Sequence, residues 1–90
     1  MFGSKEFLEV AKRTVFEMAL EGLDATDNVE FAIDDVYVTW FGFILGDMKA
    51  LLSTSLPDGR YYEVTYNKEK KEIYADCYAK LKNKVVTVNM

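Results

Sequence analysis

Histidine is absent from the 90-residue sequence, and cysteine and proline each occur once. Without histidine, the chain lacks the usual general base, the usual zinc ligand and the usual activator of a serine or cysteine nucleophile. Its five glycines form neither G-x-G-x-x-G nor G-x-x-x-x-G-K, so the sequence encodes no recognisable phosphate-binding loop. We therefore expect a protein that is not an enzyme and that has no catalytic residue, cofactor or metal site.

Two further absences bear on the cellular compartment. Cys77 has no second cysteine to pair with, and folding without disulfides is typical of a reducing environment. No stretch approaches the roughly 18 consecutive apolar residues of a membrane-spanning helix. We expect a cytoplasmic protein that does not bind to or cross a membrane.

Positive charge is scarce in the first half of the chain. The net charge is −4, and no lysine or arginine stands between Thr14 and Met48. Phosphate backbones are bound by clusters of lysine and arginine, so we expect no binding to DNA or RNA. An acidic band of this kind can present a nucleic-acid-like surface to a basic partner, although acidic residues more often serve solubility.

The apolar pattern predicts one helix followed by strands. Apolar residues recur at three- and four-residue intervals from residue 5 to about 21, which is typical of an amphipathic helix. From Val36 onward β-branched and aromatic residues predominate, with turn sequences at Gly46-Asp47 and at 56–59. We predict a single α+β domain over residues 1–90.

The expected architecture is a helix packed across one face of an antiparallel meander, similar to the cystatin-like arrangement. Four strands are indicated clearly, and "VVTV" near the C-terminus predicts a fifth. One segment allows two interpretations, because apolar residues recur every four positions in 72–85, as they would in a helix. Its tyrosine and isoleucine residues and the turn before it favour a strand.

Five of the six tyrosines lie within residues 59–78, in the second predicted hairpin. A loop of two or four residues after Tyr66 separates its apolar and polar side chains onto two faces, with Cys77 buried on the core side as a slowly reacting thiol. The outer face then carries phenols and acids, namely Tyr61, Glu63, Tyr74, Asp76 and Tyr78. We interpret this face either as a surface that recognises a protein or as cross-strand pairs that stabilise a solvated sheet.

Both faces of the first predicted hairpin are apolar. Pairing around Gly46-Asp47 places Leu45 opposite Met48, which divides the aromatic residues between two faces. One face carries Tyr37, Phe41, Phe43 and Met48, and the other carries Val36, Val38 and Trp40. A single helix covers only one face, and large apolar patches are rare on soluble monomers. We therefore expect a homodimer, in which Tyr37, Trp40, Phe41, Phe43 and Met48 form the dimer surface or, alternatively, line a pocket.

Several blocks of the sequence resemble a known family: "SKEFLEVAK", "TDNV", "DDVYVTW", "KALLST", "PDGRYYEVTYN" and "KEIYADCY". The resemblance is to small uncharacterised proteins encoded by bacteriophages and prophages of lactic-acid bacteria and streptococci. No activity and no functional residue comes with that family. The resemblance implies a phage accessory protein made in the cytoplasm of a bacterial host cell, where such proteins commonly bind and redirect host or defence proteins.

The sequence therefore supports two hypotheses about function. The first is a non-enzymatic phage accessory protein that binds a host or defence protein, for example as an inhibitor. The alternative is a small-molecule binding domain with an apolar pocket between helix and sheet. An exposed cluster of aromatic and acidic side chains favours the first function, and a cavity beside the helix favours the second.

Overall fold

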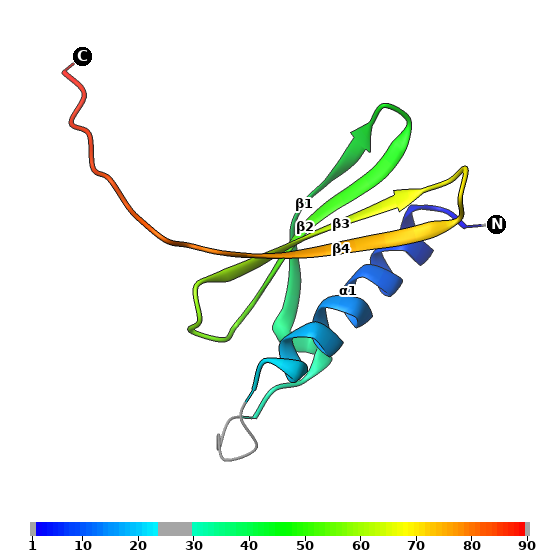
Figure 1. Ribbon diagram of the computed structural model, residues 1–90, viewed down its shortest axis with the longest axis horizontal. Coiled ribbons are helices and arrows are strands. Elements are labelled where there is room, and N and C mark those ends of the chain that lie inside the picture. Colours follow the sequence, from blue (N-terminus) through cyan, green and yellow to red (C-terminus); the bar gives the residue numbers. More distant parts are fainter. Residues whose placement is uncertain (1, 24–29, 90) are drawn as a thin grey trace.

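The computed structural model describes residues 2–23 and 30–89 (Figure 1). Helix α1 (Ser4–Glu21) is followed by a short 3-10 turn, η1 (Ile33–Asp35), and by four strands: β1 (Val36–Ile44), β2 (Asp47–Thr54), β3 (Arg60–Asn67) and β4 (Glu72–Ala79). The strands form one antiparallel sheet in the order β1-β2-β3-β4, and α1 packs across one face of it. The predicted α+β meander is confirmed, and so is the strand interpretation of the segment that begins at Glu72.

The predicted fifth strand is wrong for the described chain. Residues 80–89 carry no regular secondary structure and lead away from the body of the molecule (Figure 1). We call this segment the C-terminal arm. Its β-branched composition gave the strand prediction, but a strand also needs a partner with free backbone groups, and the arm finds none in its own sheet.

The core lies between α1 and the two central strands. A single stripe of the helix is buried, and it consists of residues four positions apart: Phe7, Ala11, Val15 and Ala19. The sheet contributes Leu52, Val64 and Tyr62, all fully buried. Alanine at two of the four helix positions lets the helix backbone approach the sheet closely, because alanine presents only a methyl group there.

The first hairpin turns at Leu45-Gly46, one residue earlier than predicted. Both residues have positive φ angles, 53° and 86°, as a two-residue type I′ turn requires. Phe43 pairs with Met48 and Phe41 with Ala50, so the predicted pairing is wrong by two residues. A leucine in the left-handed region is unusual, because its Cβ approaches the following carbonyl oxygen.

We predict that Leu45→Asn raises the free energy of unfolding by about 0.5–1 kcal/mol, because asparagine tolerates the left-handed region and Asn-Gly favours a type I′ turn. The side chain of Leu45 is 99% exposed, so its loss removes no packing. Urea unfolding followed by circular dichroism measures the change. Leu45→Ala is the control, since alanine keeps the unfavourable φ and should leave the stability unchanged. Equal effects of the two substitutions would refute the strain argument.

A β-bulge at Thr39 changes which side chains of β1 face the helix. Val38 pairs with Leu52 and Trp40 with Leu51, so Thr39 has no residue opposite it. One extra residue exchanges the two faces of a strand. As a result Val36 and Val38 lie on the helix side together with Phe41, whereas Tyr37 and Trp40 lie on the outer side. The prediction that Tyr37 shares a face with Phe41, and Val36 with Trp40, is wrong for this reason.

The second hairpin has a loop of even length, as predicted. The pairs Asn67↔Glu72 and Tyr66↔Ile73 leave residues 68–71 as the loop. Because the loop has an even number of residues, the predicted separation of apolar and polar side chains onto two faces is preserved. Tyr61, Tyr74 and Tyr78 are exposed on the outer face, which confirms the predicted orientation of this hairpin.

The prediction of a buried Cys77 is wrong. Cys77 lies opposite the buried Tyr62, yet its own side chain is exposed. The strand β4 is the edge of the sheet, and burial decreases along it from the half-buried Ile73 and Ala75 to Cys77. The face of a strand can be read from alternation, but the extent of the helix cover over an edge strand cannot.

We therefore predict that a thiol reagent modifies Cys77 in native buffer at nearly the rate seen in denaturant, within about tenfold, because access to the thiol is open. Stopped-flow absorbance with an aromatic disulfide measures both rates. A native rate that is orders of magnitude slower would show that another segment or another chain covers this end of β4.

Candidate functional site

The face of the sheet opposite α1 has no covering layer within the described residues, and we call it the outer face. Six of its side chains on β1, β3 and β4 are large, apolar or aromatic, and exposed: Tyr37, Trp40, Ile44, Tyr61, Tyr74 and Tyr78. On β2 the same face carries half-buried residues, Lys49, Leu51 and Ser53. Large aromatic residues that are held on strands present contact area at a small cost in conformational entropy.

One part of the outer face is a ladder of tyrosine and acidic side chains on β3 and β4, which we call the tyrosine–acid ladder. Tyr61 pairs with Tyr78 across the two strands, and their rings stack with centroids 5.1 Å apart. In the next outer position Glu63 stands directly opposite Asp76. The sequence prediction placed these residues on one face, and the structure brings them together with Tyr74 as neighbours.

Two carboxylates directly opposite each other repel, and one lysine offsets that repulsion. Lys49 on β2 places Nζ 2.9 Å from Glu63 Oε1. One acid of the pair is thus neutralised, and Asp76 makes no ion pair with the described residues. Glu63 foremost, with Asp76 as a smaller cause, raises the pKa of the Tyr78 phenol above its usual value. The ladder therefore presents aromatic area together with local negative charge.

Lys49 was not among the predicted site residues. Alternation places it on the outer face, but the ion pair with Glu63 depends on the pairing of β2 with β3, in which Leu51 lies opposite Glu63 and Lys49 opposite Thr65. Two residues of a turn fix the pairing of a tight hairpin, whereas β2 and β3 are joined by the longer segment 55–59. That pairing could not be read from the sequence.

The five residues predicted to form a dimer or pocket surface do not share a face. Tyr37 and Trp40 lie on the outer face, because of the bulge at Thr39. Phe41 turns toward the helix, where its ring centroid lies 6.1 Å from that of Phe7. Phe43 and Met48 lie on the same side as Phe41, and both line a pocket.

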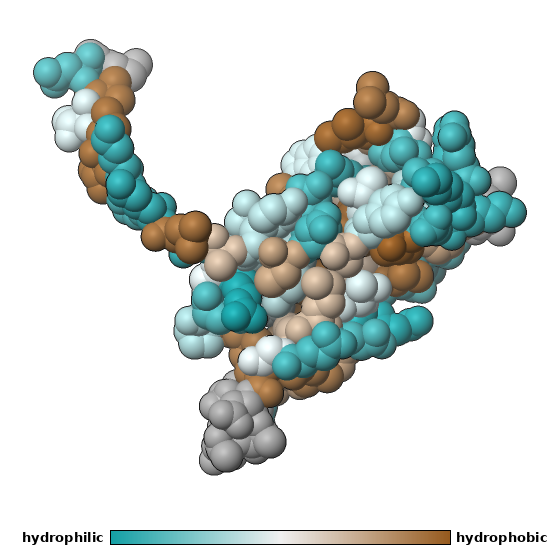
Figure 2. All heavy atoms as spheres, in the orientation of Figure 1, coloured by the Kyte–Doolittle hydropathy of each residue, from teal (hydrophilic) through white to brown (hydrophobic). Residues whose placement is uncertain are grey.

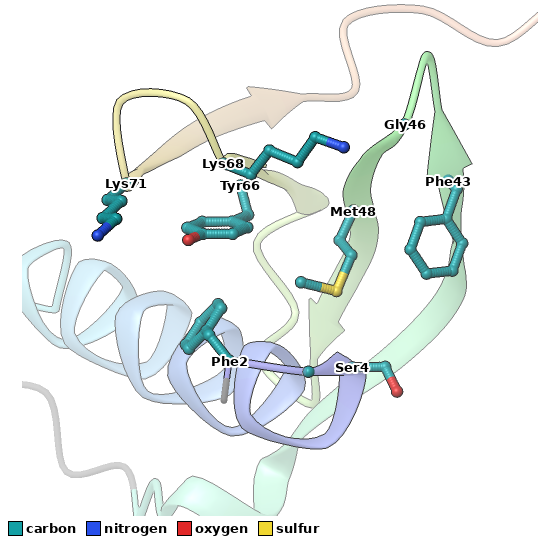
Figure 3. A pocket seen from close by; sticks show the side chains of 9 residues that line it. Phe2, Ser4, Phe43, Gly46, Met48, Tyr66, Lys68 and Lys71 are labelled. Carbon is teal, nitrogen blue, oxygen red and sulfur yellow. The ribbon is translucent and has the colours of Figure 1, made fainter.

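The pocket has a volume of about 590 Å³ and lies where the start of α1 meets the tips of both hairpins (Figure 3). Its apolar walls are side chains of Phe2, Phe43, Met48 and Tyr66, and the rings of Phe2 and Tyr66 are 4.6 Å apart. Met48 points into the space between Phe2 and Phe43 (Figure 3).

Of the described residues that line the pocket, the charged ones are both lysines, Lys68 and Lys71. They come from the β3–β4 loop, and the lysine-rich loop in the sequence was the available signal for them. Of the five residues predicted for a dimer or pocket surface, Phe43 and Met48 line this pocket, whereas Tyr37, Trp40 and Phe41 do not. The pocket can hold a small molecule with an apolar body and an anionic group.

Residues 2–23 and 30–89 contain no group of three or more His, Cys, Asp or Glu side chains that could hold a metal ion. No helix in this part of the chain is both long and apolar enough to span a bilayer.

The model of a family of unknown function, DUF6275, matches residues 8–88. The chain belongs to this family. The match includes most of α1, all four strands and most of the C-terminal arm, so the arm is part of the pattern that defines the family. No curated protein and no solved structure matches the chain.

Proposed function

We propose that the protein is a non-enzymatic binding protein whose outer face docks on another protein. The uncovered outer face carries this proposal, because it sets six large exposed apolar or aromatic side chains on a rigid sheet. Exposed surfaces of this kind on small proteins are typical of interaction sites, and tyrosine and tryptophan contribute most of the binding energy in many interfaces.

The charges on the outer face define the partner's chemistry. Glu63 is paired with Lys49, while Asp76 is free to accept a partner's cation. Stacked phenol rings such as those of Tyr61 and Tyr78 also bind a guanidinium group through their faces. We propose a partner that offers arginine or lysine side chains around an apolar centre.

The resemblance to phage and prophage proteins supports a biological setting for this binding. We propose that the protein is a phage accessory protein that acts in the cytoplasm of a bacterial host cell, where it binds a host or defence protein. By occupying a basic surface of such a partner, the protein would inhibit the interaction that this surface normally makes.

Affinity capture from a streptococcal lysate, compared between two charge variants, tests the proposal. Asp76→Lys reverses a charge in the tyrosine–acid ladder, and Glu17→Lys makes the same change on the exposed side of α1. We expect wild type and Glu17→Lys to enrich the same protein and Asp76→Lys to lose it. If Asp76→Lys captures that protein as well as wild type does, the outer face is not the docking surface.

We also propose a second candidate function, small-molecule binding, and the pocket beside Phe43 favours it. Its volume of about 590 Å³ is within the range of about 300–1,000 Å³ that is typical of ligand sites. Four apolar side chains and two lysines suit a long-chain or aromatic carboxylate. The partial positive charge at the start of α1, which lies at the pocket, also favours an anion there.

Titrations with dodecanoate and with dodecanol, monitored by amide chemical shifts, test this second function. We expect dodecanoate to shift resonances of Met48, Tyr66 and Lys68, and dodecanol to bind at least tenfold more weakly. Phe43→Ser should weaken dodecanoate binding, whereas Ile44→Ser, its neighbour on the outer face, should not. Equal affinity for the two ligands, or equal effects of the two variants, would rule out a specific site.

A further inference from the structure

We infer that the C-terminal arm is an exchanged strand, which pairs with the edge strand β1 of a second copy of the chain. Exchange in both directions then gives a two-fold dimer. This assembly gives the expected homodimer a defined interface. The interface does not include the tyrosine–acid ladder, so the inference does not depend on the docking function proposed above.

The arm has the composition of a strand but lies fully in solvent. Leu81 is 94% exposed and Val85 is 84% exposed, and Val86 and Val88 are also exposed. Figure 2 shows the arm as alternating hydrophobic and hydrophilic stretches outside the body of the molecule. Lys80, at its first position, donates a backbone hydrogen bond to Gly59 O at 3.1 Å, and the chain then leaves the sheet. Burying these apolar side chains and pairing the backbone would be favourable in a sheet.

The strand β1 is the edge that can accept another strand. It has β2 as its one neighbour in the sheet, so no strand of the described residues pairs with its other side, where the first residue, Val36, donates its N–H to Ile33 O. Natural edge strands usually carry lysine, proline or a covering segment that prevents pairing. The nine residues of β1 include no charged residue and no proline, and its one irregularity is the bulge at Thr39.

The other edge of the sheet is less suited to the arm. The strand β4 carries Glu72 and Asp76, and its C-terminal end continues directly into the arm (Figure 1). In contrast, β1 lies on the opposite side of the sheet, with β2 and β3 between it and the base of the arm. The arm leads away from its own β1, so a second copy is the source of a free β1 edge.

Charge distinguishes this pairing from pairing between two arms. The arm carries Lys80, Lys82 and Lys84 and no acid. The strand β1 is preceded by Asp34 and Asp35 and is followed after its turn by Asp47, and no basic residue occurs from residue 15 to 47. Two arms would repel each other, whereas an arm and the surroundings of β1 attract.

Sedimentation equilibrium at tens of micromolar protein tests the inference directly. Wild type should sediment with twice the 10.3 kDa mass of the chain. Val86→Pro should raise the dimer dissociation constant at least tenfold, because proline removes a ladder donor and is poorly tolerated in a paired strand. The arm lies outside the core, so the circular dichroism spectrum of this variant should remain that of a folded protein.

Amide hydrogen exchange and a charge swap identify the partner edge. The arm and β1 should be protected together, and both should lose protection on dilution. Lys82→Glu/Lys84→Glu should weaken the dimer, and mixing this variant with Asp34→Lys/Asp47→Lys should restore association between the two chains. A monomeric wild type, a dimer unaffected by Val86→Pro, or protection of β4 instead of β1 would each overturn the inference. None of these results depends on capture of a partner through Asp76.

Discussion

Replacing Phe7 with alanine is expected to lower the free energy of unfolding by about 3–5 kcal/mol, because a fully buried phenylalanine leaves a cavity that the surroundings fill only in part. Phe7 is the largest side chain of the buried helix stripe, and its ring also contacts that of Phe41. Domains of this size are typically stable by only about 5–15 kcal/mol. The variant should therefore unfold at a much lower urea concentration.

Phe43→Ala is the matched control for this substitution. It makes the same chemical change at a side chain that is 66% exposed, so less apolar surface is lost from the folded state. We expect Phe43→Ala to lower the free energy of unfolding by less than about 1 kcal/mol, as most surface substitutions do. Urea titrations followed by circular dichroism compare the two variants. Similar midpoints for both would mean that α1 does not pack on the sheet as described.

Alkaline pH is expected to destabilise the protein through Tyr62. The pKa of Tyr62 is raised from 10.0 to about 12. Burial of the phenol is the largest cause, and the charge of the nearby Cys77 thiolate and a hydrogen bond with Cys77 are smaller causes. In the unfolded chain the phenol ionises near its ordinary pKa, so unfolding is favoured once the unfolded form can lose its proton. The stability contributed by the neutral phenol is fully present below pH 10 and is lost as the pH rises to about 12.

Tyr62→Phe should remove this component of the pH dependence. At neutral pH the variant should lose only about 0.5–1.5 kcal/mol, the net value of one hydrogen bond, since the ring remains buried. Between pH 10 and about 12 its stability should fall less steeply than that of wild type. Urea midpoints for both proteins over this range measure the difference. Parallel curves would show that the Tyr62 phenol does not ionise at a higher pH in the folded state than in the unfolded state.

Much of the fold could be predicted because alternation and helical periodicity are local properties of the sequence. The stripe of α1, the turn regions and the outward orientation of Tyr61, Tyr74 and Tyr78 all follow from such patterns. The bulge at Thr39 could not be predicted, since nothing in its sequence marks it. For the same reason the placement of Tyr37 on the outer face was missed.

The candidate sites were harder to predict than the strands. Each depends on distances between segments that are remote in sequence, such as Lys49 beside Glu63, or Phe2 beside Tyr66. Cys77 shows the same limit, because its exposure depends on where α1 stops covering β4. The arm shows it most clearly, since its composition predicts a strand but does not say which sheet receives it.

The strand order β1-β2-β3-β4 also determines how fast the chain can fold. Each strand pairs only with its neighbours in sequence, so every loop that must close is short. The entropy lost in loop closure is then small, and individual hairpins form in roughly 1–10 μs. Docking of α1 across the sheet joins the most distant segments and is expected to limit the folding rate. Arm exchange requires an encounter between two chains, so it should follow as a slower phase whose rate rises with protein concentration.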